Sequence, residues 1–135
     1  MSQENIALVR GLYEAFGRGD VDTVLAGFAD DIEWNEPEGS PYAGQHHGPQ
    51  GVVENVFGRL PEDWDGFDVT PEEILGDGER VVVLLTQRGT AKETGKQLEM
   101  PAAHSWIVRD GKVQSFRLLA DAGTMKAALG VEAAA

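Results

Sequence analysis

The chain has 135 residues, with 23 acidic and 11 basic side chains and a formal net charge of −12 at pH 7. This balance argues against nucleic acid as a partner, because phosphate binding needs a basic surface, and it does not favour an anionic membrane surface. Cysteine is absent, which excludes disulfides, thiolate nucleophiles and cysteine-ligated metals.

A chain of this length is typical of one domain with one hydrophobic core. We find no internal repeat, low-complexity tract or domain boundary, so we expect a single domain over residues 1–135, with an ordered core over about residues 5–129 and a frayed tail at residues 131–135. The N-terminus lacks the basic segment of a secretory signal, and no apolar run has the length of a membrane span. We therefore expect a cytoplasmic protein.

The N-terminal part of the chain is expected to form two helices. The first begins near Ser2, a suitable N-cap, and ends at residues 17–19, and Asp20 then caps a shorter second helix. Their apolar residues recur at helical spacing, as Ile6, Val9, Tyr13 and Phe16 in the first helix and Val21, Val24, Leu25 and Phe28 in the second. Such a pair presents one broad apolar surface.

A short strand is expected after Asp30 and Asp31, with Ile32, Trp34 and Glu36 on one face. Residues 38–51 are rich in proline, glycine and serine and are predicted to be a loop, which contains Tyr42, His46 and His47. A third helix is predicted from Gly48-Pro49 to Pro61, because proline suits the first helical position.

The second half of the chain predicts an antiparallel meander of four strands followed by a terminal helix over residues 122–129. The first strand covers residues 67–75, where Pro71 implies an edge or a bulge, and the second covers residues 80–91. Helices followed by such a meander indicate an α+β fold. A strongly bent sheet around the helices would leave a conical cavity, and its outer face would be covered most simply by a second subunit.

The last two strands are joined by Asp110-Gly111, a dipeptide favoured in two-residue hairpin turns. Counting outward from a pair of Arg109 with Lys112 places His104 opposite Arg117. With a period of two, one face then carries a polar and aromatic mixture that suggests a ligand cavity, namely His104, Trp106, Ser115, Arg117, Leu119 and Asp121. The opposite face carries Ile107, Phe116 and Leu118, which become candidates for the covered outer face.

These features together resemble the SnoaL-like, ketosteroid isomerase-related proteins of the nuclear transport factor 2-like (NTF2-like) superfamily. The resemblance covers about residues 5–129 and is carried by Gly19-Asp20, Phe28-Ala29-Asp30-Asp31, Glu36-Pro37 with Gly39-Ser40, the hairpin from His104 to Val113, and Asp121. It implies a cone-shaped α+β barrel of the cystatin-like type, with three N-terminal helices packed in a bent, mainly antiparallel sheet. One such scaffold hosts isomerases, cyclases, hydrolases and binding proteins, so the fold does not decide the activity.

The resemblance also implies candidate catalytic residues. Glu36 falls on the position of the isomerases' catalytic carboxylate, and His104 falls on their second acid if one residue is deleted in the turn. Asp121 resembles the acid/base residue of SnoaL-type cyclases. The isomerases' oxyanion tyrosine falls on Leu12, and Tyr13 is one residue away, which is a rotation of about 100° on a helix.

Each candidate also has a purely structural interpretation. His104 is either a group that titrates near neutrality or a cavity histidine bonded to Asp121 or to the backbone of Arg117. Asp121 is either a base or the N-cap of the terminal helix. Glu36 is either a desolvated base or a solvated carboxylate at a strand end, and Arg117 is either an anion anchor or a counter-ion to Asp121. The residues expected to contact a ligand are Tyr13, Trp34, Tyr42, Trp106 and Arg117.

We expect no metal, because the adjacent His46 and His47 point in opposite directions on an extended chain. No phosphate loop, nucleotide fingerprint or activated serine motif is present, so any catalysis is expected to be cofactor-free. One hypothesis is a small acid/base enzyme of the isomerase, cyclase or hydrolase type, acting on a mainly apolar, oxygenated small molecule. The alternative is a non-catalytic ligand-binding or dimeric accessory module. In either case we expect a homodimer.

Overall fold

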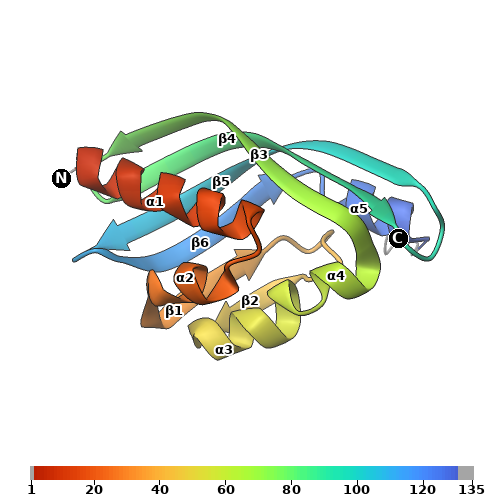
Figure 1. The fold of residues 1–135 in the computed structure, drawn as a ribbon, viewed down its shortest axis with the longest axis horizontal. Coiled ribbons are helices and arrows are strands. Elements are labelled where there is room, and N and C mark those ends of the chain that lie inside the picture. The colour runs from red at the N-terminus through yellow and green to blue at the C-terminus, as the bar shows by residue number, and fades with distance from the viewer. Residues whose placement is uncertain (1, 131–135) are drawn as a thin grey trace.

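The computed structural model describes residues 2–130 and shows helices on one side of a strongly bent sheet (Figure 1). The predicted tail at residues 131–135 lies outside the described residues. The helices are α1 (Ser2–Gly17), α2 (Val21–Ala26), α3 (Gly48–Val52), the π-helix η1 (Val53–Phe57), α4 (Leu60–Asp63) and α5 (Gly123–Leu129). The strands are β1 (Phe28–Glu36), β2 (Gly44–His47), β3 (Trp64–Asp77), β4 (Arg80–Ala91), β5 (Gln97–Arg109) and β6 (Lys112–Ala120).

The first two helices form where the sequence predicted them, except that Phe28, predicted to belong to the second helix, is the first residue of β1. Asp20 caps α2, because its carboxylate accepts a hydrogen bond from the backbone N–H of Thr23 at 3.2 Å and another from Thr23 Oγ1 at 2.6 Å. The predicted third helix, in contrast, is divided into α3, η1 and α4. Residues 44–47, predicted as part of a loop, form β2, which pairs antiparallel with β1.

The six strands lie in the order β2-β1-β6-β5-β4-β3. Only β1 and β6 are parallel, so the sheet is mainly antiparallel, as predicted. β3 is an edge strand whose register shifts between Pro71 and Glu73, which confirms that Pro71 marks an edge and a bulge. This arrangement of helices and curved sheet is the predicted α+β fold, with α1 lying along the sheet, α3 beside β1 and β2, and α4 against β3 (Figure 1).

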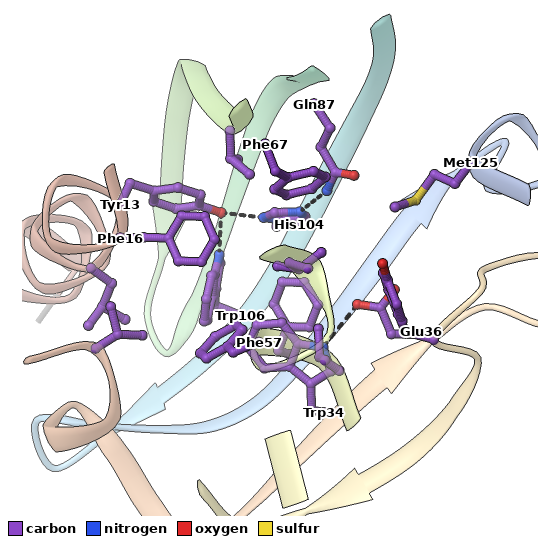
Figure 2. A pocket seen from close by; sticks show the side chains of 17 residues that line it. Tyr13, Phe16, Trp34, Glu36, Phe57, Phe67, Gln87, His104, Trp106 and Met125 are labelled. Carbon is purple, nitrogen blue, oxygen red and sulfur yellow. Dashed lines mark hydrogen bonds between the residues drawn. The ribbon is translucent and has the colours of Figure 1, made fainter. Parts of the chain in front are cut away.

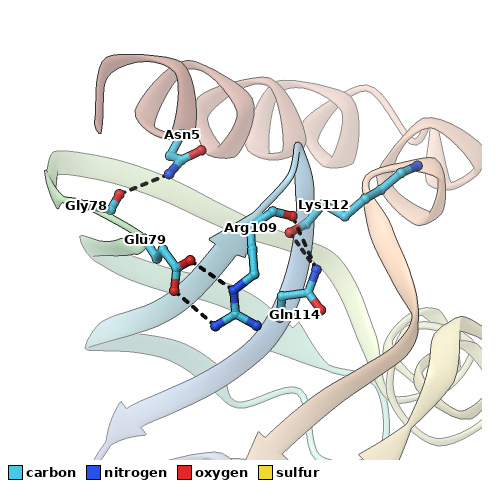
Figure 3. Close-up of polar contacts among 6 residues, drawn as sticks. All are labelled: Asn5, Gly78, Glu79, Arg109, Lys112 and Gln114. Carbon is cyan, nitrogen blue, oxygen red and sulfur yellow. Dashed lines mark hydrogen bonds and ion pairs between the residues drawn. The ribbon is translucent and has the colours of Figure 1, made fainter. Parts of the chain in front are cut away.

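The hairpin between β5 and β6 begins as the sequence predicted. Asp110 and Gly111 both have positive φ angles, of 53° and 72°, which is the conformation of a type I′ turn. Arg109 pairs with Lys112, and Val108 pairs with Val113. The turn of this hairpin is held beside the preceding turn by Arg109, which contacts Glu79 through two nitrogens at 2.9 and 3.0 Å (Figure 3).

Beyond Val113 the predicted register is wrong, because β6 contains a β-bulge. Ile107 pairs with Ser115, so Gln114 is left out of the pairing, and its side-chain amide donates back to the carbonyl oxygens of Arg109 and Lys112 (Figure 3). One extra residue moves every later side chain of the strand to the other face. His104 therefore pairs with Leu118 rather than with Arg117.

The bulge turns Phe116 and Leu118 into the core, where they are 1% and 2% exposed, and turns Arg117 and Leu119 outward. The prediction that Phe116 and Leu118 lie on the outer face is thus wrong. The physical reason is the cost of the alternative, since an unbulged strand would bury an arginine and a serine and would expose a phenylalanine and a leucine.

The terminal helix also begins differently from the prediction. Its N-cap is Ala122, and no side chain caps it. The backbone carbonyl of Asp121, rather than its carboxylate, accepts the hydrogen bond from Thr124 N at 3.0 Å. The predicted role of Asp121 as a side-chain N-cap is therefore wrong.

Alanine is expected to have opposite effects at two glycines, one in the type I′ turn and one in α1. Gly111→Ala should lower the free energy of unfolding by about 1–2 kcal/mol, because an L-residue is disfavoured at its positive φ. Gly11→Ala, at an exposed position of α1 with open space around the added Cβ, should raise it by about 0.5–1 kcal/mol. Urea unfolding of both variants measures this, and a neutral Gly111→Ala would contradict the turn.

Candidate functional site

An apolar cavity lies between the helices and the concave face of the sheet (Figure 2). Its volume is about 70 Å³, and its walls are mostly aromatic and aliphatic side chains from all helices except α3, from all strands except β2, and from the loop that contains Tyr42. Apart from the indole N–H groups, its polar members are Tyr13, Glu36, Tyr42, Gln87 and His104. A small, mostly apolar cavity with a few convergent polar groups has the character of a ligand site.

Three of the lining side chains, Trp34, Trp106 and Phe116, form an aromatic cluster on the sheet. Trp34 stacks on Phe116 with ring centroids 3.7 Å apart, and Phe116 in turn meets Trp106 edge-on at 4.8 Å. The inward turn of Phe116 at the bulge makes this cluster possible. Trp34 and Trp106 thus line the cavity, as the sequence predicted for them.

A hydrogen-bonded group joins α1 to β5 inside the cavity wall. The Tyr13 hydroxyl and His104 Nδ1 are 2.5 Å apart, and Trp106 Nε1 donates to the same hydroxyl oxygen at 3.0 Å. On the other side of the imidazole, Gln87 Nε2 lies 3.2 Å from His104 Nε2. Figure 2 shows Tyr13, His104 and Gln87 joined in one line by hydrogen bonds, with Trp106 bonded to the Tyr13 hydroxyl from one side of that line. Tyr13, which the isomerase pattern put one residue out of place, is therefore part of the site.

His104 is held in its neutral form. It is 5% exposed, and its burial away from water lowers its pKa from an ordinary value of 6.5 to about 3. One interpretation of the sequence required His104 to titrate near neutrality, and with this lowered pKa it does not. The same desolvation raises the pKa of Tyr13, so this hydroxyl also stays neutral. The hydrogen bonds among Tyr13, His104, Trp106 and Gln87 therefore join neutral side chains.

Glu36 is the one carboxylate among the lining residues described in 2–130. Its two oxygens are positioned by donors, Trp34 Nε1 at 2.9 Å and Ser40 Oγ at 3.0 Å. Burial raises the pKa of this carboxyl, and the two hydrogen bonds oppose that rise only in part. A carboxyl whose pKa is raised in this way accepts a proton more readily than an ordinary carboxyl does.

Tyr42 contributes its ring to the cavity but directs its hydroxyl away from it. The hydroxyl donates to Asp63 Oδ2 at 2.7 Å and accepts a hydrogen bond from Trp64 Nε1 at 3.0 Å. Arg59 lies over the ring, 5.4 Å from its centroid. Tyr42 therefore shapes the wall between α4 and the sheet, while its polar group has a structural role.

A profile of the SnoaL-like domain matches residues 9–116. The chain belongs to this family. An NTF2-like protein from Burkholderia thailandensis E264 is 32% identical, with 96% of this chain and 98% of that chain covered and a TM-score of 0.89. TerC, co-crystallised with polyporic acid, is 28% identical, with 94% and 98% covered and a TM-score of 0.84.

A protein with a cystatin-like fold from Xanthomonas campestris, 24% identical with 98% and 100% covered, shares the fold at a TM-score of 0.82. These likenesses confirm the predicted SnoaL-like membership and the NTF2-like, cystatin-like architecture. No curated protein matches the chain.

Two predicted site residues of this SnoaL-like chain lie outside the cavity. Arg117 is exposed on the outer face of the sheet, opposite Ser105, because the bulge reverses the face on which it was predicted. Asp121 is exposed after the end of β6 and does not line the cavity. The structure thus brings together Glu36, His104, Tyr13, Trp34 and Trp106, together with the ring of Tyr42.

Gln87 is the polar residue of the cavity that sequence reasoning missed. It follows Val81, Val83 and Leu85 at a spacing of two along β4, and these three are at most 1% exposed. A polar residue that continues a buried apolar face is an anomaly that the period-two pattern could have revealed.

Two further findings concern the described residues 2–130. No group of three or more His, Asp or Glu side chains there is arranged to hold a metal ion. No helix in this part of the chain combines the length and the apolar character that a membrane crossing requires.

The depressed pKa of His104 predicts a pH dependence of stability. Between pH 6.5 and about 3 the unfolded chain binds a proton on His104 that the folded chain does not, so the free energy of unfolding falls as the pH falls, by up to about 1.4 kcal/mol per pH unit. His104→Gln should lack this part of the slope, and His47→Gln, at an exposed position, should retain it. Urea unfolding at pH 7, 6 and 5 measures the slopes, and equal slopes in all three proteins would contradict a neutral, buried His104.

Proposed function

We propose that this SnoaL-like protein binds a mainly apolar, oxygenated small molecule in the cavity and catalyses a proton transfer next to its carbonyl group. The observation that carries the proposal is Glu36, the single carboxylate among the described lining residues, which Trp34 and Ser40 hold in a mostly apolar cavity. Isomerase and cyclase reactions use such a step, and in a hydrolase reaction the same carboxylate would instead take a proton from the attacking water.

The roles of the polar groups follow from their chemistry. Glu36 would take a proton from the carbon next to the carbonyl and return it, because a carboxyl with a raised pKa is a better base than an ordinary one. The Tyr13 hydroxyl, positioned by Trp106 and His104, would donate to the carbonyl oxygen as negative charge develops there. Both groups would act in a mostly apolar cavity, where such interactions are stronger than in solvent.

The similarity to TerC supports an oxygenated ligand. TerC was co-crystallised with polyporic acid, and the match with TerC covers 94% of the present chain. Polyporic acid is therefore a reasonable first probe, alongside small ketones, lactones and epoxides.

Glu36→Gln should lower turnover by about 10²–10⁴-fold without loss of ligand binding. Glutamine has nearly the same shape, and the Ser40 hydroxyl can accept a hydrogen bond from its amide, so the fold should be preserved. Glu38→Gln, two residues away at an exposed position, is the matched control and should leave turnover unchanged. The measurement is turnover of the substrate found by the screen, together with binding of the same compound.

Equal turnover by Glu36→Gln and the unmodified protein would exclude Glu36 as the base. Tight binding of a compound that no form of the protein converts would favour the alternative, a non-catalytic ligand-binding module.

We also propose that two copies of the chain associate through the outer face of the sheet. Within residues 2–130, all three exposed large apolar side chains lie on this face, namely Leu75, Leu84 and Leu119, which are 50%, 39% and 50% exposed. Leu84 and Leu119 flank Ala103 in one row across three strands. A second copy would cover this row, whereas the chain's own helices cover the other face.

Leu119→Arg should convert a dimer into a monomer, because it places a charge at one end of the apolar row that the second copy would cover. Ala127→Arg adds the same charge at an exposed position of α5 and should leave the dimer intact. Light scattering coupled to gel filtration measures the mass of each protein. A monomeric unmodified protein would contradict this interface.

A further inference from the structure

One buried polar atom in the cavity wall has no partner. Among the buried side-chain nitrogen and oxygen atoms of residues 2–130, only Gln87 Oε1 lacks a hydrogen bond. Gln87 is 5% exposed and lines the cavity, and in the view of Figure 2 its oxygen points away from His104. An unpaired buried carbonyl is unfavourable, so a group that enters the cavity and donates to it gains stabilisation.

The proton positions around His104 decide what Gln87 can offer. A neutral imidazole carries one N–H, so one ring nitrogen donates and the other accepts. Trp106 Nε1 can only donate, which means that the Tyr13 oxygen always accepts one hydrogen bond from it. Two arrangements of the remaining protons are then possible.

In the first arrangement the Gln87 amide N–H donates to His104 Nε2, and the imidazole N–H is on Nδ1 and donates to the Tyr13 oxygen. The Tyr13 hydroxyl proton is then free, and so is Gln87 Oε1. The wall presents one donor and one acceptor, on either side of the imidazole.

In the second arrangement the Tyr13 hydroxyl donates to His104 Nδ1, and the imidazole N–H is on Nε2. Gln87 must then turn its amide by 180° so that Oε1 accepts this N–H. The wall now presents the amide NH2 of Gln87, and neither the Tyr13 proton nor the Gln87 oxygen is free. The two arrangements differ in no charge, only in the tautomer of His104 and the orientation of one amide.

We propose that Gln87 is the specificity-determining residue of the cavity and that its Oε1 accepts a hydrogen bond from a hydroxyl group of the ligand. The ligand class is a neutral hydroxy-carbonyl compound, whose hydroxyl donates to Gln87 while its carbonyl oxygen accepts the free proton of Tyr13. Such a molecule satisfies both groups of the first arrangement at once. This inference rests on the proposed function, because it places the ligand in the same cavity.

The proposal couples ligand chemistry to the tautomer of His104. A ligand hydroxyl that donates to Gln87 Oε1 stabilises the first arrangement, with the imidazole proton on Nδ1. A methyl ether in the same place has no proton to donate and can only accept from the Gln87 amide, so it stabilises the second arrangement, with the proton on Nε2. The tautomer is therefore a readout that mere filling of the cavity would not change.

The test compares 4-hydroxyacetophenone with 4-methoxyacetophenone on the unmodified protein. Quenching of the tryptophan fluorescence reports binding, because Trp34 and Trp106 line the cavity. The ¹⁵N chemical shifts of His104 in histidine-labelled protein report the tautomer, with the signal assigned by its loss in His104→Gln. We expect the hydroxyl compound to bind about tenfold more tightly and to move His104 toward Nδ1–H, and the ether to move it toward Nε2–H.

Gln87→Met, which keeps the length of the side chain without its amide, should remove the roughly tenfold preference for 4-hydroxyacetophenone over the ether, because methionine offers neither the oxygen nor the amide N–H. Gln50→Met, at an exposed position of α3, is the matched control and should retain the preference. If Gln87→Met does not fold, the comparison of the two compounds on the unmodified protein still decides the question.

Equal affinity for the two compounds, with the same His104 tautomer in both complexes, would overturn this inference and leave the proposed function standing. Failure of both compounds to bind the unmodified protein would overturn this inference together with the proposal that the cavity takes an oxygenated small molecule. Loss of turnover in Glu36→Gln bears on the proposed function alone.

Discussion

The position of one extra residue in β6 determines which side chains form the cavity. Because Gln114 is left out of the pairing with β5, Phe116 turns inward and stacks on Trp34, and Leu118 packs beside His104. A regular strand would instead bring Arg117 into the interior, where its desolvation would cost several kcal/mol without a paired carboxylate. The aromatic wall against which Tyr13 and His104 are positioned thus depends on the bulge.

Burial affects the two ionisable groups of the site in opposite senses. It favours the neutral form of each, so it raises the pKa of Glu36 and lowers that of His104. The interior therefore disfavours charge although the chain as a whole has a net charge of −12. In such a cavity a neutral ligand would be recognised through the directions of its hydrogen bonds. The neutral imidazole of His104 can carry its proton on either nitrogen, and it would therefore contribute to the selectivity.

Part of the candidate site could be predicted from the sequence, and the rest depended on pairing between distant strands. Glu36 and Trp34 share a strand, so their common face followed from local periodicity, and His104 and Trp106 followed in the same way on β5. Arg117 and Asp121 were assigned to the cavity by counting residue pairs outward from the turn. That count was wrong because it assumed a regular strand, whereas β6 contains a bulge that depends on the packing of Phe116. Gln87 lies on β4 and contacts His104 on β5, and no local pattern reveals such a contact between strands.

The sequence by itself determined the features that depend on a few neighbouring residues. These are the cap of α2 at Asp20, the type I′ turn at Asp110-Gly111, the edge character of β3 at Pro71 and the α+β order of helices and strands. Only the tertiary structure decided which face of β6 is buried, the division of the third helix and the neutral state of His104. These depend on how much apolar surface can be buried and how much water is excluded, and both are properties of the whole packed chain.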